Sequence, residues 1–292
     1  MFSLLTICLF LIIIFLYIKI WNKFIHKVPT GIGILLTIPC FFYFDQNLDY
    51  IISILVISFT FIYFLDDLVE INFLWRIILQ ISASLIIYFH FITETNLIFI
   101  LINTLIFLML VNTLNFQDGE DLNISILLII IFSNFYFNTN NKFTQNTSEL
   151  ILLFLISFSF FNFKKKFLYF GDSSCYFISI IIFLFVYSEL KNEILIKSLI
   201  SIVIFPIIDV IYVVIYRIFK KENLLSRNYL HLYQIIAKKT NSKLYILPNI
   251  LFPLLNIFIS SYFSLGTFFI VFLVISNTFI LIITHLILKK FI

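Results

Sequence analysis

The chain has 292 residues, of which 62% are hydrophobic and 12% are charged, and its net charge is +4. Its mean hydropathy is +1.12. Soluble domains carry roughly 25% charged residues, so a soluble protein of this composition would lack the polar residues needed to cover its surface. Disorder requires the opposite composition. Because the apolar runs are continuous rather than alternating, the sequence predicts an all-α polytopic membrane protein, with residues 1–292 forming a single integral membrane domain.

Eleven apolar segments are candidates for membrane-spanning helices, each of which needs about 20 residues to cross a bilayer. In chain order they are 2–20, 31–44, 50–65, 74–89, 97–114, 122–137, 149–163, 174–188, 197–217, 244–262 and 266–288. The first segment has no basic residue before it and no small-residue cleavage site after it. These features favour a first membrane span over a cleaved signal peptide.

The distribution of basic residues predicts the orientation of these segments. If the N-terminus lies outside, eleven spans place the C-terminus inside, and the inner side then carries sixteen Lys and Arg residues against three on the outer side. This asymmetry follows the positive-inside rule. The same rule accounts for the net positive charge, so we expect a lipid bilayer and no nucleic acid as partner.

Acidic residues and glycines gather on the predicted inner face. Ionisable groups near a bilayer are costly, so a cluster of them indicates a functional site by default. The acids are Asp66, Asp67, Asp118, Glu120, Asp121 and Asp172, and four of the five glycines lie beside them: Gly31, Gly33, Gly119 and Gly171. Glycine allows the backbone to turn sharply or to approach a ligand closely. The pattern therefore predicts an active site at the cytosolic face.

Asp66 and Asp67 end the third predicted span. Adjacent carboxylates cannot face one direction on a helix, so we expect one to bind substrate or a cation and the other to be held by a basic neighbour. The alternative is an ordinary acidic helix end, although a carboxylate there opposes the helix dipole.

The segment from Asn112 to Asp121 places polar side chains at intervals of three residues. Asn112 and Asn115 share one helix face, and Asp118 and Asp121 continue the interval beyond it. Oxygen ligands of this kind suit Mg²⁺, which takes one or two carboxylates together with substrate phosphate. The alternative is a loop in which Asp and Asn cap helix ends.

Three further features complete the set of candidates. Asp172 follows Gly171 where a span begins, and a helix N-terminus attracts anions, although Asp172 could equally be an N-cap. Asp209, three residues after Pro206, lies deep enough in its span to need a partner that the sequence does not name. His231 lies in the longest inner loop, where a lone histidine is usually solvated.

In this order, these segments resemble the polyprenyl-phosphate N-acetylhexosamine-1-phosphate transferase family, a branch of glycosyltransferase family 4. The matching pieces are Pro29-Thr-Gly-x-Gly33, Asp66-Asp67, Asn112-x-x-Asn-x-x-Asp-Gly-x-Asp121, Gly171-Asp-Ser173, Pro206-x-x-Asp209 and the loop around His231. Each piece is weak by itself, and the ordered set is specific.

The resemblance implies a reaction in the bacterial inner membrane. Undecaprenyl phosphate attacks the β-phosphorus of a UDP-amino sugar, UMP leaves, and a lipid-diphospho-sugar remains for cell-envelope polysaccharide synthesis. The implied catalytic residues are Asp66, Asp67 and His231. The implied ligands of Mg²⁺, or of Mn²⁺ in its place, are Asp172 and Asn115. The implied substrate-binding residues are Lys27, Asn115, Asp118, Gly119, Asp121 and Tyr169, with Tyr169 stacked on uracil.

The chain departs from the family pattern at several positions. Leu122 stands where a second glycine is usual, and Tyr233 and Gln234 stand where further histidines are usual. These departures favour an O-antigen or teichoic-acid initiator over the peptidoglycan translocase. Two other interpretations remain open: a transporter or lipid flippase that uses Asp209 and a span broken at Pro206, and a catalytically inactive relative. A homodimer also remains open.

Overall fold

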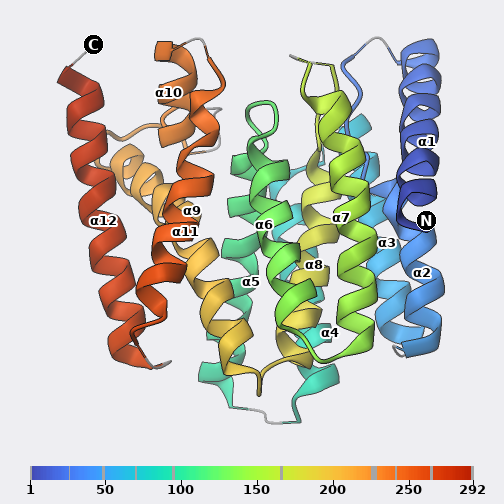
Figure 1. Cartoon of the computed structure of the whole chain (residues 1–292), viewed down its shortest axis with the longest axis horizontal. Helices are drawn as coiled ribbons and strands as arrows, with labels where there is room; N and C mark the ends of the chain where they lie inside the picture. The colour runs from blue at the N-terminus through green and yellow to red at the C-terminus, as the bar shows by residue number, and fades with distance from the viewer. Residues whose placement is uncertain are drawn as a thin grey trace.

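A computed structural model of the chain describes residues 2–25, 27–47, 50–69, 71–93, 96–164, 167–224, 229–240, 242–263 and 266–290. Within these residues the protein contains twelve α-helices, one 3₁₀ helix and no β-strand (Figure 1). The prediction of an all-α protein is confirmed.

Each of the eleven predicted spans corresponds to one helix, because a long apolar run can satisfy its backbone in lipid only as a helix. The helices are α1 (Phe2–Phe24), α2 (Ile34–Asn47), α3 (Tyr50–Leu68), α4 (Phe73–Phe91), α5 (Leu97–Gln117), α6 (Asn123–Asn138), α7 (Lys142–Asn162), α8 (Asp172–Ser188), α9 (Glu193–Phe219), α10 (Leu232–Thr240), η1 (Lys243–Ile246), α11 (Pro248–Ser260) and α12 (Thr267–Lys290). Helix α10, which has nine residues, lies between two of the predicted spans.

Seven helical segments in the described part of the chain are long and apolar enough to cross a membrane, by length and composition. They are found in α1, α3, α4, α5, α9, η1 with α11, and α12. Helices α6 and α8 are apolar but shorter, with 16 and 17 residues. The protein is therefore a multi-pass membrane protein, whereas the count of eleven spans and their orientation stay predictions.

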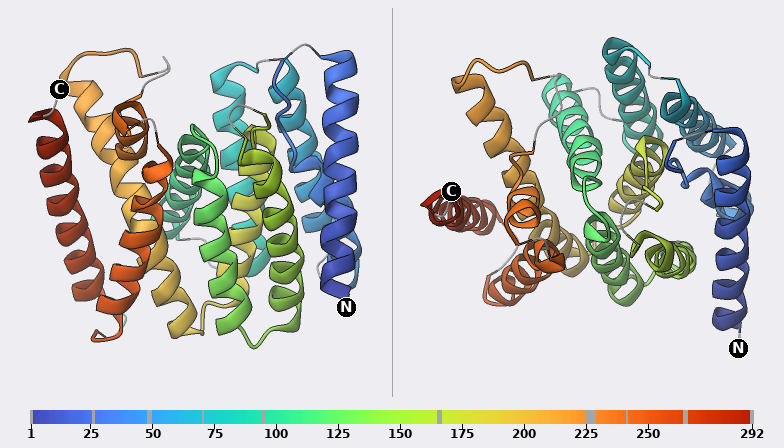
Figure 2. Two further views of the ribbon diagram at one scale, coloured as in Figure 1. Left: turned by 45° about the horizontal axis from the view of Figure 1, so that its top comes forward. Right: turned by 90° about the horizontal axis from the view of Figure 1, so that it is seen from above.

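Helix α8 is the central helix of the bundle. Almost every residue from Ser173 to Phe185 is buried, and α3 and α5 pack against it. A helix that is apolar on all sides is stable only when other helices surround it. Helices α1 and α12, which expose far more of their apolar surface, lie at opposite margins of the bundle (Figure 2, right).

Helix α9 passes through Pro206 without interruption from Glu193 to Phe219. Pro206 was expected to break or kink this span, and the structure shows no break there. A proline removes one backbone hydrogen bond of a helix, and Pro206 is buried within α9.

The loops that contain the sequence motifs lie together at one end of the bundle. The loops after α1, α5 and α7 lie at the upper end in Figure 1, where α8 begins. We call this surface the loop face and define it as residues 27–33, 66–69, 115–122 and 167–174. The N-terminal end of α1 and the C-terminal end of α12 lie at opposite ends of the bundle (Figure 2, left).

Candidate active site

Two glycine-containing loops meet at the centre of the loop face. The backbone N–H groups of Gly31 and Ile32 donate to the carbonyl of Phe170, at 3.1 and 3.3 Å. Gly31 and Gly171 have φ angles of +73° and +87°, which residues with a side chain rarely adopt. A Cβ atom at Gly31 would lie 2.7 Å from Oδ2 of Asp67. These glycines therefore allow two backbones to touch, which places the start of α8 against the loop after α1.

Asp67 caps the N-terminus of α8. Its carboxylate accepts the backbone N–H groups of Asp172 and Ser173, at 3.0 and 3.1 Å, and the hydroxyl of Ser173, at 2.8 Å. Negative charge is favourable at this end of a helix. Asp67 thereby fixes the first turn of α8, on which Asp172 stands.

Asp118 holds the turn immediately before α8. Its Oδ2 atom accepts the backbone N–H of Gly171 at 2.8 Å, and its Oδ1 atom accepts that of Phe170 at 3.3 Å. Burial raises the pKa of Asp118 to about 7, while these two amide hydrogen bonds act in the opposite direction. Asp118 therefore fixes the backbone of the two residues that precede Asp172.

Arg76, near the start of α4, links Asp66 to Asp172. Its Nε atom lies 2.8 Å from Oδ2 of Asp66, and its Nη2 atom donates to Oδ1 of Asp66 at 2.9 Å. Its Nη1 atom donates to Oδ2 of Asp172 at 3.1 Å. The side chain of Asp66 is 0% exposed, whereas those of Arg76 and Asp172 are 30% and 26% exposed. Arg76 is the basic neighbour expected for one of the paired acids.

The structure shows the protein partners of Asp66 and Asp67. The resemblance implied that the two carboxylates bind or deprotonate the lipid phosphate, and these roles stay predictions. Asp66 accepts the backbone N–H of Ile71 at 2.6 Å besides its contacts with Arg76. Asp67 bonds to the start of α8. Both carboxylates therefore contact protein partners in this conformation.

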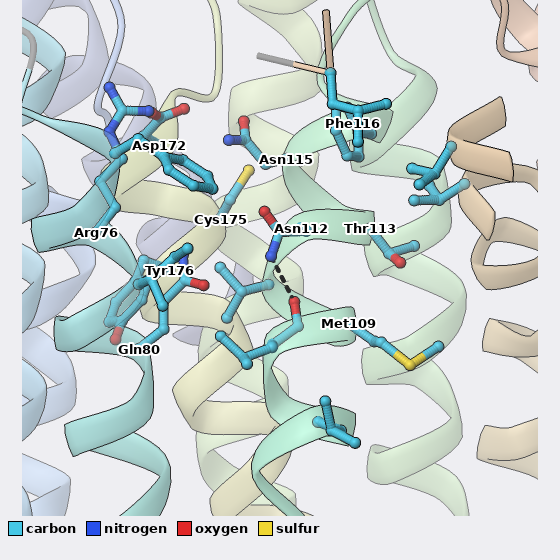
Figure 3. Close-up of a pocket in the computed structure, with 18 of the residues that line it drawn as sticks. Arg76, Gln80, Met109, Asn112, Thr113, Asn115, Phe116, Asp172, Cys175 and Tyr176 are labelled. Atoms are coloured by element: carbon cyan, nitrogen blue, oxygen red, sulfur yellow. Dashed lines mark hydrogen bonds and ion pairs between the residues drawn. The ribbon is translucent and has the colours of Figure 1, made fainter. Parts of the chain in front are cut away.

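An apolar cavity of about 490 Å³ adjoins the exposed edge of this network. Arg76, Asp172 and Asn115 lie at its polar end, with Asn115 on α5 and Asp172 at the start of α8 (Figure 3). The rest of the wall comes from α4, α5, α8 and α9, and is formed largely by Ile77, Leu105, Leu108, Met109, Val111, Tyr176, Val210, Ile211, Val214 and Ile215.

The cavity opens toward the region where lipid would surround the bundle. Phe73, Leu105, Ile211 and Ile215 line it and are themselves exposed apolar side chains on helices that are candidate membrane spans. Exposed apolar surface of this kind faces hydrocarbon in a membrane protein. The cavity therefore combines a charged head region with an apolar body, which suits an amphiphilic ligand.

Of the ten predicted site residues, Asn115 and Asp172 line this cavity. The other eight do not: Asp66, Asp67 and Asp118, which support it as described above, and Lys27, Gly119, Asp121, Tyr169 and His231. Lys27 is exposed, and Tyr169 is held by a backbone bond to Pro29 at 2.9 Å. The carbonyl of Asp121 accepts the Tyr245 hydroxyl at 2.9 Å.

The side chains of Tyr233 and Gln234 cover Gly119. A Cβ atom at Gly119 would lie 2.9 Å from Nε2 of Gln234 and closer still to the Tyr233 hydroxyl. Tyr233 and Gln234, which stand where the family usually has histidines, therefore lie over Gly119, one of the residues that the resemblance implied would bind substrate.

Asp209 and His231 are partners. His231 Nδ1 lies 2.9 Å from Oδ2 of Asp209, and both side chains are 2% exposed. Asp209 is therefore the buried acid that needed a partner, and His231 is buried rather than solvated.

Three of the basic residues counted on the predicted inner side, Lys165, Lys166 and Arg227, lie outside the described residues.

Sequence reasoning missed Arg76 and Cys175 as site residues. Arg76 was counted only as a topological charge, although an isolated cation within an apolar span is a signal that could have found it. Cys175 was interpreted as an apolar filler and instead lines the cavity, next to Asn115 and Tyr176 (Figure 3).

Among the described residues, no group of three or more His, Cys, Asp or Glu side chains could hold a metal ion. A cation at this site would therefore rely on few protein ligands. Asp172 and Asn115 both line the polar end of the cavity and supply one carboxylate and one amide oxygen. This donor set fits Mg²⁺, which keeps several waters and takes one or two protein carboxylates together with substrate phosphates.

The fold and the cavity define a multi-pass membrane protein with a polar, acid-rich site at one end of an apolar cavity. Residues 49–189, which run from the start of α3 to the end of α8, match the model of the family described as glycosyl transferase family 4. This match supports a sugar-phosphate transferase that acts on a lipid-linked substrate in a membrane. A comparison with curated proteins found no match.

The matched segment contains Asp66, Asp67, Arg76, Asn115 and Asp172. The loop at 27–33, Asp209 and His231 lie outside it.

Proposed function

We propose that this protein transfers an N-acetylhexosamine-1-phosphate from a UDP-sugar to undecaprenyl phosphate in the bacterial inner membrane. UMP leaves, and the lipid-diphospho-sugar serves cell-envelope polysaccharide synthesis, of the O-antigen or teichoic-acid type. The observation that carries the proposal is the Arg76, Asp172 and Asn115 head region at the end of an apolar cavity that faces lipid.

The lipid acceptor fits the cavity by its two-part chemistry. Its polyprenyl chain would lie along the apolar wall between α5 and α9, where burial removes it from bulk lipid without a polar penalty. Its phosphate would lie at the head region, where the Arg76 side chain lines the cavity and is 30% exposed. A planar guanidinium can bond two phosphate oxygens at once.

The charge balance of the site calls for a cation. Four carboxylates surround the head region, and within the described residues Arg76 is the one cation that pairs with any of them. A phosphate would add further negative charge. Mg²⁺, or Mn²⁺, held by Asp172 and Asn115 would neutralise the diphosphate and stabilise the departing UMP.

The remaining residues hold this arrangement in place. Asp66 fixes the orientation of Arg76, and Asp67 and Asp118 fix the backbone from which Asp172 projects. Phosphoryl transfer depends mainly on positioning and on charge neutralisation. We assign Lys27, Gly119, Asp121, Tyr169 and His231 to the side of the site that receives the UDP-sugar from the cytosol.

The direct test is release of UMP by the purified protein in lipid nanodiscs. The assay contains undecaprenyl phosphate, Mg²⁺ and, in turn, each member of a panel of UDP-sugars. We expect turnover with at least one UDP-amino sugar, loss of turnover with EDTA, and recovery with Mg²⁺ or Mn²⁺. Folded wild-type protein that binds nucleotide but releases no UMP would indicate an inactive relative and would refute the proposal.

Two matched variants sharpen the test. Asp172→Asn removes the charge that would hold the cation and should abolish turnover without unfolding the protein. Glu189→Gln makes the same chemical change in a buried acid at the opposite end of α8, which bonds to Thr139, and should keep wild-type turnover. Full activity of Asp172→Asn would remove Asp172 from the site.

No observation favours the transporter interpretation. That interpretation was based on Asp209 and a span broken at Pro206. In the structure α9 is continuous, and Asp209 is paired with His231.

A further inference from the structure

A second cluster of titratable side chains lies outside the matched family segment. Asp209 on α9, His231 just before α10 and His285 on α12 meet in the interior, and they are 1%, 1% and 4% exposed. Oδ2 of Asp209 lies 2.9 Å from His231 Nδ1, and its Oδ1 accepts the backbone N–H of Leu232 at 3.1 Å. Nε2 of His285 lies 3.9 Å from the same Oδ1 atom.

The carboxylate determines which nitrogen of His231 carries the proton. A carboxylate can only accept, so Nδ1 must carry the hydrogen. Nε2 is then the nitrogen available to another partner. In the described structure Nε2 of His231 is buried and has no hydrogen-bond partner. A buried polar atom left unpaired is costly, which indicates that a ligand group completes this site.

The ring of His231 lies directly behind the wall of the cavity. Its centroid is 5.2 Å from that of Phe116, which lines the cavity and follows Asn115. Tyr233 stacks on the imidazole at 6.2 Å, and its hydroxyl donates to the carbonyl of Phe116 at 2.5 Å. His231 is therefore one side chain away from the head region, and α9 and α10 hold it there.

We infer that Asp209 is a positioning residue, which fixes the tautomer and ring orientation of His231 so that Nε2 can accept a hydrogen bond from the P–O–H group of a singly ionised lipid phosphate. This inference rests on the proposed function. A merely structural anchor would need only an acceptor for the N–H of Leu232, and an asparagine could supply that acceptor. The contact with His231 requires a group that cannot donate. Asp209→Asn therefore separates the two roles.

The kinetic test compares Asp209→Asn, His231→Ala and the double variant with the wild type. In Asp209→Asn the amide nitrogen can donate to Nδ1, which would move the hydrogen to Nε2 and turn an acceptor into a donor. We expect kcat to fall about 100-fold or more, within the range for a misplaced acid–base group, with the KM for the UDP-sugar changed far less. The double variant should be no slower than His231→Ala, because residues that act as a unit are not additive.

Two kinetic outcomes would overturn the inference: Asp209→Asn with near wild-type kcat, or a double variant whose losses multiply. Glu189→Gln is the matched control for loss of a buried carboxylate. It lies at the far end of the bundle, with Thr139 as its partner, and should leave kcat unchanged.

A second measurement needs no turnover and reads the wild-type protein directly. Nitrogen-15 NMR of histidine-labelled wild-type protein reports which ring nitrogen of His231 is protonated, with the signal assigned by its absence in His231→Ala. Protonated Nδ1 supports the inference, and a neutral ring protonated at Nε2 overturns it. If the wild type releases no UMP from any donor, the proposed function fails while this measurement still decides the pairing.

Discussion

Removal of the Arg76 guanidinium tests whether the ion network holds the site together. Arg76→Gln deletes both contacts with Asp66 and the contact with Asp172. Asp66 would then keep the backbone N–H of Ile71 as its partner among the described residues. Its side chain is 0% exposed, so a carboxylate would remain buried without a counter-charge.

The expected magnitude follows from the exposure of the two partners. Breaking a buried ion pair by removing one partner costs about 3–5 kcal/mol. Arg76 itself is 30% exposed, so water can partly replace it, and we expect a loss near the lower bound, about 3 kcal/mol. Since 1 kcal/mol shifts the melting temperature of a chain of similar size by about 2–4 °C, the apparent Tm should fall by about 6–12 °C.

Thermal unfolding in detergent, followed by intrinsic fluorescence, measures this fall. The double variant Arg76→Gln with Asp66→Asn removes both charges and should regain most of the lost stability. Lys191→Gln, which removes an exposed cation at the opposite end of the bundle, should leave Tm unchanged. An Arg76→Gln protein as stable as the wild type, or a double variant less stable than either single one, would refute the network.

Two further predictions concern the loop face. Gly31→Ala places a Cβ atom 2.7 Å from Asp67 Oδ2 at a φ of +73°. Its apparent Tm should fall by several degrees, as expected for about 1–2 kcal/mol of backbone strain plus a clash. Gly266→Ala is the control, because its Cβ atom would meet nothing within 4 Å, and its Tm should match that of the wild type. Burial raises the pKa of Asp118 to about 7. Between about pH 4 and pH 7 the folded protein therefore holds a proton on Asp118 that the unfolded chain has lost. In metal-free buffer the free energy of unfolding should fall as the pH rises from about 4 to 7, and it should level off above that. Asp118→Asn should flatten this slope, and an unchanged slope would contradict the assignment.

Much of the fold could be predicted because lipid allows few solutions. Every one of the eleven apolar segments is a helix, since a continuous apolar run in a membrane must satisfy its backbone internally. The number of crossings is a weaker inference from the same runs. Helix α2 has 14 residues and α8 has 17, and a helix of that length does not by itself span about 30 Å of hydrocarbon.

The partners of the charged groups could not be predicted in the same way. A buried acid signals that a partner exists, but not which one. Arg76 bridges acids that lie 10 and 96 residues away in the chain, and Asp209 finds His231 22 residues further on. Such pairs depend on how the helices pack, which local sequence periodicity does not contain.

The structure shows what two of the glycines do. We expected the glycines to let the backbone turn sharply or approach a ligand closely. Gly31 and Gly171 let two loops approach each other. Leu122, where the family pattern suggests glycine, has a φ of +64°. The backbone there keeps the conformation that suits glycine, and the N–H of Leu122 is held by the Asn162 side chain at 2.5 Å.

Acids that look equivalent in the sequence divide into groups once their partners are known. Asp67 and Asp118 accept backbone N–H groups, and Asp66 is enclosed with Arg76. Asp172 alone among these four described residues lines the cavity, and its side chain keeps 26% exposure. A ligand can therefore reach one carboxylate of the cluster without displacing a protein partner from the other three. Substitutions of Asp66, Asp67 and Asp118 should act through stability and geometry, whereas substitution of Asp172 should act on the ligand itself.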